Sequence, residues 1–440
     1  MDLTHLSWPF FDSDHLEFAR KFDRWVRAEL GEFERDEGGD GRAARQIFEL
    51  FANSGWLKNT LPAQQTSNHQ SKICLRKASV MREISAFSSA IADVALSEPW
   101  LGILPIALCG SQDIQEELLP GYLSGRLLPA FALSEPDAGS DATAITTIAR
   151  RDGNRYIING RKTWTSNCGL ADLYIVFARI DGQDGAGGIA AFAIDGEESG
   201  IELEERLSVL PPHTVGTWTL KDCSIPSRRM IGEPGQGFKI AMNVLELFRS
   251  TVGAATLGFA RRAMSEAVER SVSRTAFKKP ISEHQLIQAK LAEMAVGIDA
   301  AALLVYRAAW QHDATERSIS QEAAIAKLYS TETALTSSIR QCKSLADWAW
   351  FEERQWSVFF GIPERFGFSM EPVKFSSSSS PEMCSRTDNR ERLLVCRFSD
   401  AGNDDLTPPS GGRRPKSAAD EPHLARKHLR GYVRSWWKLA

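Results

Sequence analysis

The chain has 440 residues, of which 43% are hydrophobic and 25% are charged, and its formal net charge is −4. This length allows two or three domains with cores of their own, and the small negative charge predicts no nucleic-acid or membrane-surface partner. The seven cysteines form no C-x-x-C pair. That pattern argues against both a disulfide framework and a zinc site, and it favours a reducing, cytoplasmic location.

Residues 1–129 are expected to form a helical domain. The N-terminus lacks the basic start of a signal peptide. In "DSDHLEFARKFDRWVRAEL" (residues 12–30) the apolar residues recur at helical spacing. The run "WLGILPIALCG", from Trp100, is too short to span a bilayer and predicts a buried helix. The polar stretch "PAQQTSNHQSK" (residues 62–72) interrupts the pattern and predicts a loop.

Residues 130–234 are expected to form a small β-barrel or sandwich. Runs such as "NRYIINGRKTWTSN" and "DLYIVFARIDGQDGAGGIAAFAIDG" are rich in β-branched and aromatic residues and are bounded by Gly, Asp and Asn. Several short strands joined by tight turns are typical of closed or sandwiched β domains.

Residues 235–336 are expected to form a helical bundle. From Phe238 a helical pattern runs for more than thirty residues without proline, and two further alanine-rich helical segments follow at 283–313 and 320–336. Long helices around an alanine-rich seam favour a bundle. The predicted fold class is therefore α+β, with an N-terminal helical domain, a middle β-barrel and a C-terminal helical bundle.

Two segments between Pro129 and Asn167 carry side chains suited to a ligand. Gly139, Ser140 and Asp141 predict a compact turn with amides and hydroxyls available. In "NGRKTWTSN", Trp164 is flanked by hydroxyl residues and predicts a platform for a flat aromatic cofactor. The spacing by itself equally allows two ordinary turns of a β domain.

The same stretch, "SEPDAGSD" followed by "GRKTWTSN", resembles the signature of the acyl-CoA dehydrogenase family, "TEPxAGSD" and then "G.K.WITN". "IPSRRMIGEPGQGFKIAM" and "RTAFKKPISEHQLIQAKLAEM" resemble two further family motifs in the same order, so the resemblance covers about residues 12–336. It implies an FAD-dependent enzyme that removes hydrogen across the α,β-bond of an acyl-CoA thioester. It also implies an electron-transfer flavoprotein as acceptor and a homotetramer or homodimer.

The resemblance implies roles for individual residues. One set would lie along the flavin ring or cover its other face: Phe131, Leu133, Ser134, Trp164 and Ser166. A second set would reach the FAD of a neighbouring subunit: Arg274, Phe277 and Gln285. Ser140 would lie near the acyl-CoA entrance, and Arg249 would lie beside the active site.

The catalytic base is not assigned by the resemblance. The family places a glutamate either in a C-terminal "YEGT" motif or on the helix beginning near Leu245. Phe248 occupies the second place and cannot accept a proton, and Glu246 points about 200° away around the helix. The chain as written is therefore expected to lack its base. The alternatives kept open are a flavin oxidase or N-hydroxylase on the same fold and a non-catalytic relative.

Residues 337–440 do not resemble the family and are interpreted as the product of a reading-frame shift near Ser337. The serine run at 376–380 is typical of disorder, but the three tryptophans between 348 and 356 are not. Read one base out of step, the junctions 347–348, 348–349, 350–351 and 370–371 must encode Leu, Gly, Val and Gly. The neighbouring codons then permit the family's missing motifs, with Tyr, His, Asn or Asp at the position of the glutamate.

Overall fold

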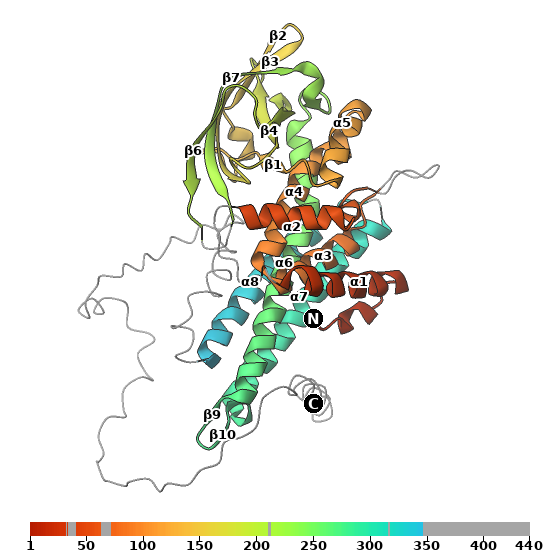
Figure 1. Cartoon of the computed structure of the whole chain (residues 1–440), viewed down its shortest axis with the longest axis vertical. Helices are drawn as coiled ribbons and strands as arrows, with labels where there is room; N and C mark the ends of the chain where they lie inside the picture. The colour runs from red at the N-terminus through yellow and green to blue at the C-terminus, as the bar shows by residue number, and fades with distance from the viewer. Residues whose placement is uncertain (32, 34–40, 63–71, 210–212, 316, 346–440) are drawn as a thin grey trace, which may run out of the picture. The chain divides into compact units, whose positions relative to one another are not determined.

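The computed structural model describes residues 1–31, 33, 41–62, 72–209, 213–315 and 317–345 (Figure 1). All of them belong to one of two compact units, Met1–Ser369, and the other unit is Met370–Ala440. Most of the predicted loop at 62–72 and the part of the predicted tail after Leu345 lie outside the described residues.

The N-terminal part is helical, as predicted. Its elements are η1 (Thr4–Ser7), α1 (Ser13–Glu29), α2 (Arg42–Asn53), η3 (Leu57–Thr60), α3 (Leu75–Ser88), α4 (Ala90–Cys109) and α5 (Gln112–Leu123). The apolar spacing of α1 buries Ala19, Phe22 and Val26 against the core.

Helix α4 is the apolar run that the sequence predicts as a buried helix. It is long and apolar enough to cross a membrane, yet 78% of its most apolar window is buried inside the protein, as in the core helix of a folded domain. Ser89 separates it from α3 and accepts a hydrogen bond from the Ala92 amide at 3.3 Å, which makes Ser89 the N-cap of α4.

The middle part is a single mixed β-sheet. The strands are β1 (Pro129–Ala132), β2 (Ile148–Asp152), β3 (Arg155–Ser166), β4 (Leu173–Ile180), β5 (Ile189–Asp195), β6 (Ile201–Leu207), β7 (Val215–Pro226) and β8 (Met230–Ile231). Their order is β6-β7-β3-β2-β4-β5-β8, and β1 pairs in parallel with β4. Short helices η4 (Ala142–Ala144), η5 (Ala186–Gly188) and η6 (Ser227–Arg229) lie in the connections.

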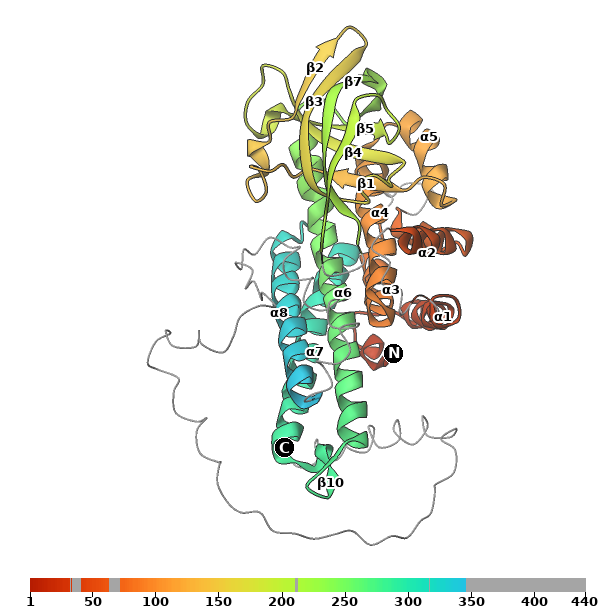
Figure 2. The ribbon, with the colours of Figure 1, turned by 60° about the vertical axis from the view of Figure 1, so that its left-hand side comes forward.

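The C-terminal described part is a set of long helices, as predicted. It consists of α6 (Gly237–Ser273), the short strands β9 (Thr275–Ala276) and β10 (Lys279–Pro280), η7 (Ile281–Glu283), α7 (Gln285–Ala314) and α8 (Ser320–Leu345). Figure 2 shows α6 running from the β-sheet down to β10, with α7 and α8 beside it. A Cβ on Gly258 would lie 2.2 Å from the Glu83 carbonyl oxygen, so only glycine lets α6 approach α3 this closely.

Helix α8 continues through Ser337 to Leu345, past Thr336, the predicted end of the bundle segment.

Candidate active site

A bulge in β3 turns Trp164 out of the sheet. Lys162 lies opposite Trp218 of β7 and Thr165 lies opposite Gly216, so β3 has one residue more than β7 over this interval. Trp164 lies in this interval with a left-handed φ of 55°, and its side chain is 59% exposed. Bulges often redirect side chains next to binding sites, and an exposed tryptophan offers a face on which a flat ring can stack.

The segment after β1 is tied to this bulge. The Thr163 amide donates to the Ser134 carbonyl at 3.0 Å, and the Lys162 ammonium donates to the Leu133 carbonyl at 3.1 Å. Leu133 is buried and Ser134 half-buried. The two segments predicted to line a flavin therefore adjoin each other.

Sequence reasoning missed the ion pair beneath these segments. The fully buried Lys162 ammonium lies 2.7 Å from a Glu135 carboxylate oxygen, and Glu135 also accepts hydrogen bonds from the Thr146 and Thr147 amides. Burial raises the pKa of Glu135, but the Lys162 charge and these hydrogen bonds outweigh it and lower the pKa to about 2. The pair ties together the two segments that are predicted to line a flavin.

The donor set fits a flat cofactor with a polar edge. Beside Trp164 lie the half-buried hydroxyl residues Ser134 and Ser166. The buried Asn167 side-chain nitrogen has no hydrogen-bond partner among the described residues. Exposed aromatic area together with unused donors is the chemistry that a flavin ring requires. Phe131 packs its ring 4.9 Å from that of Phe177 in β4, which anchors the start of this wall.

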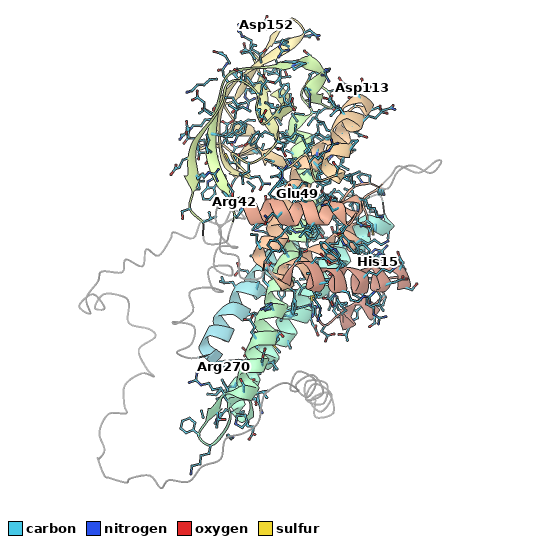
Figure 3. All side chains as sticks on the ribbon, in the orientation of Figure 1. His15, Arg42, Glu49, Asp113, Asp152 and Arg270 are labelled. Carbon is cyan, nitrogen blue, oxygen red and sulfur yellow. The ribbon has the colours of Figure 1, made fainter. Side chains whose placement is uncertain are left out.

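The second predicted set lies elsewhere. Arg274 follows α6, Phe277 stands in the β9–β10 turn with 92% of its side chain exposed, and Gln285 begins α7. Helix α6 has 37 residues and starts at Gly237, which packs on Ala190 of β5. At 1.5 Å per residue it is about 55 Å long. This turn is thus at the far end of α6 from the sheet, near the labelled Arg270 (Figure 3).

Phe248 fills the helix position where the family can carry a base. Its ring is buried, with the Arg82 guanidinium 4.7 Å from its centre. Arg82 is itself held by both oxygens of Asp93 at 3.0 and 2.9 Å and by the Thr251 hydroxyl at 3.2 Å. The next residue, Arg249, is half-buried on α6, and its charge helps burial to lower the pKa of Lys327 on α8.

Glu246 is engaged in holding α8. Its carboxylate accepts a hydrogen bond from the Ile319 amide at 2.9 Å and further bonds from the Ser318 and Ser320 hydroxyls. Burial raises its pKa, but these bonds outweigh that effect and lower it. This agrees with the expectation that Glu246 is not the base.

Ser140 is exposed in the turn that leads to η4. Asp141 caps that element by accepting from the Thr143 amide at 3.1 Å. The predicted compact turn is present. Ser140 and Ser134 lie in the same connection, between β1 and β2.

The described chain runs from helices to a β-sheet and back to helices, with the exposed Trp164 where β3 adjoins the segment after β1, an arrangement that fits a three-part flavoenzyme fold. Three family models match in that order. The models for the N-terminal, middle and C-terminal domains of acyl-CoA dehydrogenase match residues 12–126, 130–222 and 235–342.

Relatives agree with the family models. The chain is 33% identical over 332 residues to a 3-(aryl)acrylate reductase of Clostridium sporogenes, covering 74% of this chain and 86% of the relative. It is 36% identical over 263 residues to the human mitochondrial short-chain specific acyl-CoA dehydrogenase, covering 59% of this chain and 63% of that enzyme. The chain therefore spans less than two thirds of the human enzyme.

Solved structures share the fold. A glutaryl-coenzyme A dehydrogenase in complex with glutaryl-CoA superposes with a TM-score of 0.73 at 26% identity, covering 83% of this chain and 92% of that one. Butyryl-CoA dehydrogenase from Megasphaera elsdenii gives a TM-score of 0.69 at 28% identity, covering 82% and 94%. The chain belongs to the acyl-CoA dehydrogenase family, and the predicted fold, enzyme class and FAD cofactor are confirmed at that level.

Proposed function

We propose that the protein is of the kind that uses FAD to oxidise the α,β-bond of an acyl-CoA thioester. The observation that carries this proposal is the tie between the two flavin-lining segments, through the Thr163 amide and the Ser134 carbonyl, beneath the exposed Trp164. When bound there, FAD supplies a two-electron acceptor.

The chain's own residues would position the cofactor. Trp164 would cover one face of the flavin ring, Leu133 would shield its apolar side, and the Ser134 and Ser166 hydroxyls would bond its polar edge. Ser140 would lie near the thioester entrance and Arg249 beside the acyl site. Because Arg274, Phe277 and Gln285 lie at the far end of α6, their proposed flavin contact belongs to a neighbouring subunit. An arginine fork suits a pyrophosphate, and this sharing favours a homo-oligomer.

The base is proposed to be encoded out of frame. Phe248 cannot be the base because it cannot accept a proton. Glu246 is excluded as the base because its carboxylate is hydrogen-bonded to the start of α8. The codon straddling Ser369 and Met370 allows Tyr, His, Asn or Asp. Of these, aspartate is the anionic base that an apolar cleft can tune upward in pKa, and it requires a TCG codon for Ser369.

A second candidate is the reverse reaction, reduction of an α,β-unsaturated acid derivative. The relative with the widest coverage reported above is named for reduction of 3-(aryl)acrylates. An oxidase or N-hydroxylase would differ by consuming oxygen without a thioester. We further propose a cytoplasmic location and an electron-transfer flavoprotein as electron acceptor.

Anaerobic absorbance spectroscopy and a separate aerobic oxygen-uptake assay, both on the frame-restored chain, separate these functions. Bleaching of bound flavin by saturated acyl-CoA supports dehydrogenation. Reoxidation of reduced flavin by an arylacrylate, without bleaching by saturated thioesters, supports the reductase. Oxygen uptake on an amine or nitroalkane supports the oxidase reading. Sequencing codons 335–342 of the gene tests the frame shift independently.

A further inference from the structure

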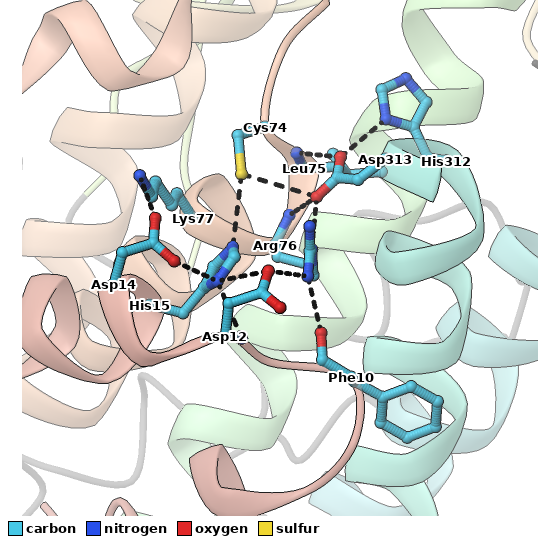
Figure 4. A network of polar contacts seen from close by, with 10 residues as sticks. All are labelled: Phe10, Asp12, Asp14, His15, Cys74, Leu75, Arg76, Lys77, His312 and Asp313. Atoms are coloured by element: carbon cyan, nitrogen blue, oxygen red, sulfur yellow. Dashed lines mark hydrogen bonds and ion pairs between the residues drawn. The ribbon is translucent and has the colours of Figure 1, made fainter. Parts of the chain in front are cut away.

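Three potential metal ligands meet where the N-terminal helices approach the end of α7, in elements other than those that carry Ser134 and Trp164. They are His15 at the start of α1, the free Cys74 just before α3, and Asp313 at the end of α7 (Figure 4). Their ligand atoms all lie within 4.8 Å of one another. The sequence could not indicate this group, because Cys74 is 59 residues from His15 and 239 from Asp313.

The spacing of the ligand atoms suits a tetrahedral cation. The Cys74 sulfur lies 3.7 Å from His15 Nε2 and 3.5 Å from Asp313 Oδ2. Around zinc, with bonds of about 2.3 Å to sulfur and about 2.0 Å to nitrogen or oxygen, ligand atoms stand about 3.5 Å apart. We infer that His15, Cys74 and Asp313 form a binding site for a thiophilic divalent cation of the zinc type.

His15 is prepared for this role by its other ring nitrogen. Nδ1 lies 3.2 Å from an Asp14 carboxylate oxygen, and a carboxylate behind a ligating histidine is the usual support of such a ligand. Ligation through Nε2 places the proton on Nδ1, where Asp14 accepts it. The contact between the Asp12 amide and Nδ1 at 3.3 Å is then given up. Burial lowers the pKa of His15.

The cation would replace one proton. The Cys74 thiol donates to Asp313 Oδ2, and burial and the Asp313 charge raise the pKa of the thiol to about 11. Binding releases that proton to solvent and leaves sulfur as thiolate. With the thiolate formed, the charged groups here are four negative ones, Asp12, Asp14, Asp313 and Cys74, and two positive ones, Arg76 and Lys77. Their net charge is −2, which a divalent cation neutralises.

Asp313 also caps the N-terminus of α3, and these contacts fix the position of its carboxylate. Its oxygens accept hydrogen bonds from the Leu75 amide at 2.7 Å and from the Arg76 amide and guanidinium at 3.1 and 2.8 Å. These bonds cap α3 and hold the carboxylate still. The cation would share Oδ2 with Arg76, at the position now taken by the thiol proton. His15 and Cys74 are therefore the principal ligands, and Asp313 completes the site.

Cobalt titration of the full-length, chelator-treated and reduced chain tests the site. We expect one Co²⁺ per chain, with a sulfur-to-cobalt charge-transfer band that Zn²⁺ abolishes. Cys74→Ser and His15→Gln should each remove the band or weaken binding by roughly tenfold or more, and Asp14→Asn should weaken it roughly tenfold. Cys109→Ser, at another half-buried free cysteine, should change nothing.

Two results would overturn the site. One is the absence of a charge-transfer band in the unmodified chain, and the other is an unchanged band in Cys74→Ser. Circular dichroism of each variant checks that the variant is folded. If Cys74→Ser does not fold, the conservative His15→Gln change provides the second test. Because the measurement needs no flavin and no acyl-CoA, its failure leaves the proposed function standing.

Discussion

At the scale of single residues, alternation along β3 was a usable signal that sequence reasoning passed over. Tyr156, Ile158 and Lys162 are all buried on this strand, so the period of two predicts that Lys162 points inward and needs a partner. The bulge that exposes Trp164 could not be predicted, because it depends on the register with β7. The motif predicted a platform at Trp164, but it could not predict the backbone turn that exposes this side chain.

Lys162→Met should destabilise the chain by about 3–5 kcal/mol, because it leaves the buried Glu135 carboxylate without its counter-charge. Urea unfolding followed by fluorescence measures this. Adding Glu135→Gln should recover part of the loss. As a matched control, Lys221→Met breaks an exposed pair with Glu202 and should produce no measurable change. An equal effect at both lysines would refute the role given to the buried pair.

Stability should fall between about pH 4.5 and pH 2 partly through Glu135. Its folded pKa of about 2 is below the ordinary 4.5, so its stabilising effect is complete above pH 4.5 and is lost as the pH falls toward 2. Glu135→Gln should flatten the unfolding free energy against pH in this window. A slope that Glu135→Gln leaves unaltered would show that the carboxylate is not held by Lys162.

At the scale of elements, helical periodicity predicted where the long helices lie, but it did not predict where one helix ends and the next begins. The division between α3 and α4 depends on the Ser89 cap, and the start of α8 depends on Glu246, 73 residues earlier in the chain than Ile319. A cap from a distant element leaves no local pattern. For the same reason the cap of α3 by Asp313 was not foreseen.

Glu246→Ala should lower stability by about 1 kcal/mol through loss of the α8 cap. Hydrogen exchange should show the gain in amide exchange concentrated at the start of α8. The half-buried Glu322, in the first turn of α8, provides the control substitution to alanine. Unchanged protection near Ile319 would contradict the capping role.

Helix α7 presents an apolar stripe that favours association. Val296, Leu303 and Trp310 recur every seven residues and are 70%, 47% and 39% exposed. Replacing all three by glutamine should shift the chain toward monomer in sedimentation velocity with little change in its unfolding midpoint. Leu203→Gln, at an exposed apolar position on β6, serves as control. An identical mass distribution would show that the proposed homo-oligomer does not use this stripe.

At the scale of the whole molecule, four motifs in order were enough to predict the family, because each joins a local structure to the next. One chain brings together only part of the predicted site. Trp164 and Ser134 adjoin within it, but Arg274 and Gln285 lie at the far end of α6, and their proposed target is in another copy. The catalytic base could not be located, because the Phe248 side chain cannot accept a proton and the Glu246 carboxylate is hydrogen-bonded to the start of α8.

The central claim is that this family's flavin site is present here and that the chain from about Ser337 onward is read out of frame. Its most direct test is an anaerobic titration with acyl-CoA of two purified proteins, the chain as written and the frame-restored chain, with the flavin content of each recorded from the same spectra. We expect about one FAD per chain and bleaching by acyl-CoA in the restored protein, and less than roughly a tenth of that flavin in the chain as written. Stoichiometric, acyl-CoA-reducible flavin in the chain as written would contradict the account, as would a restored protein that binds no flavin.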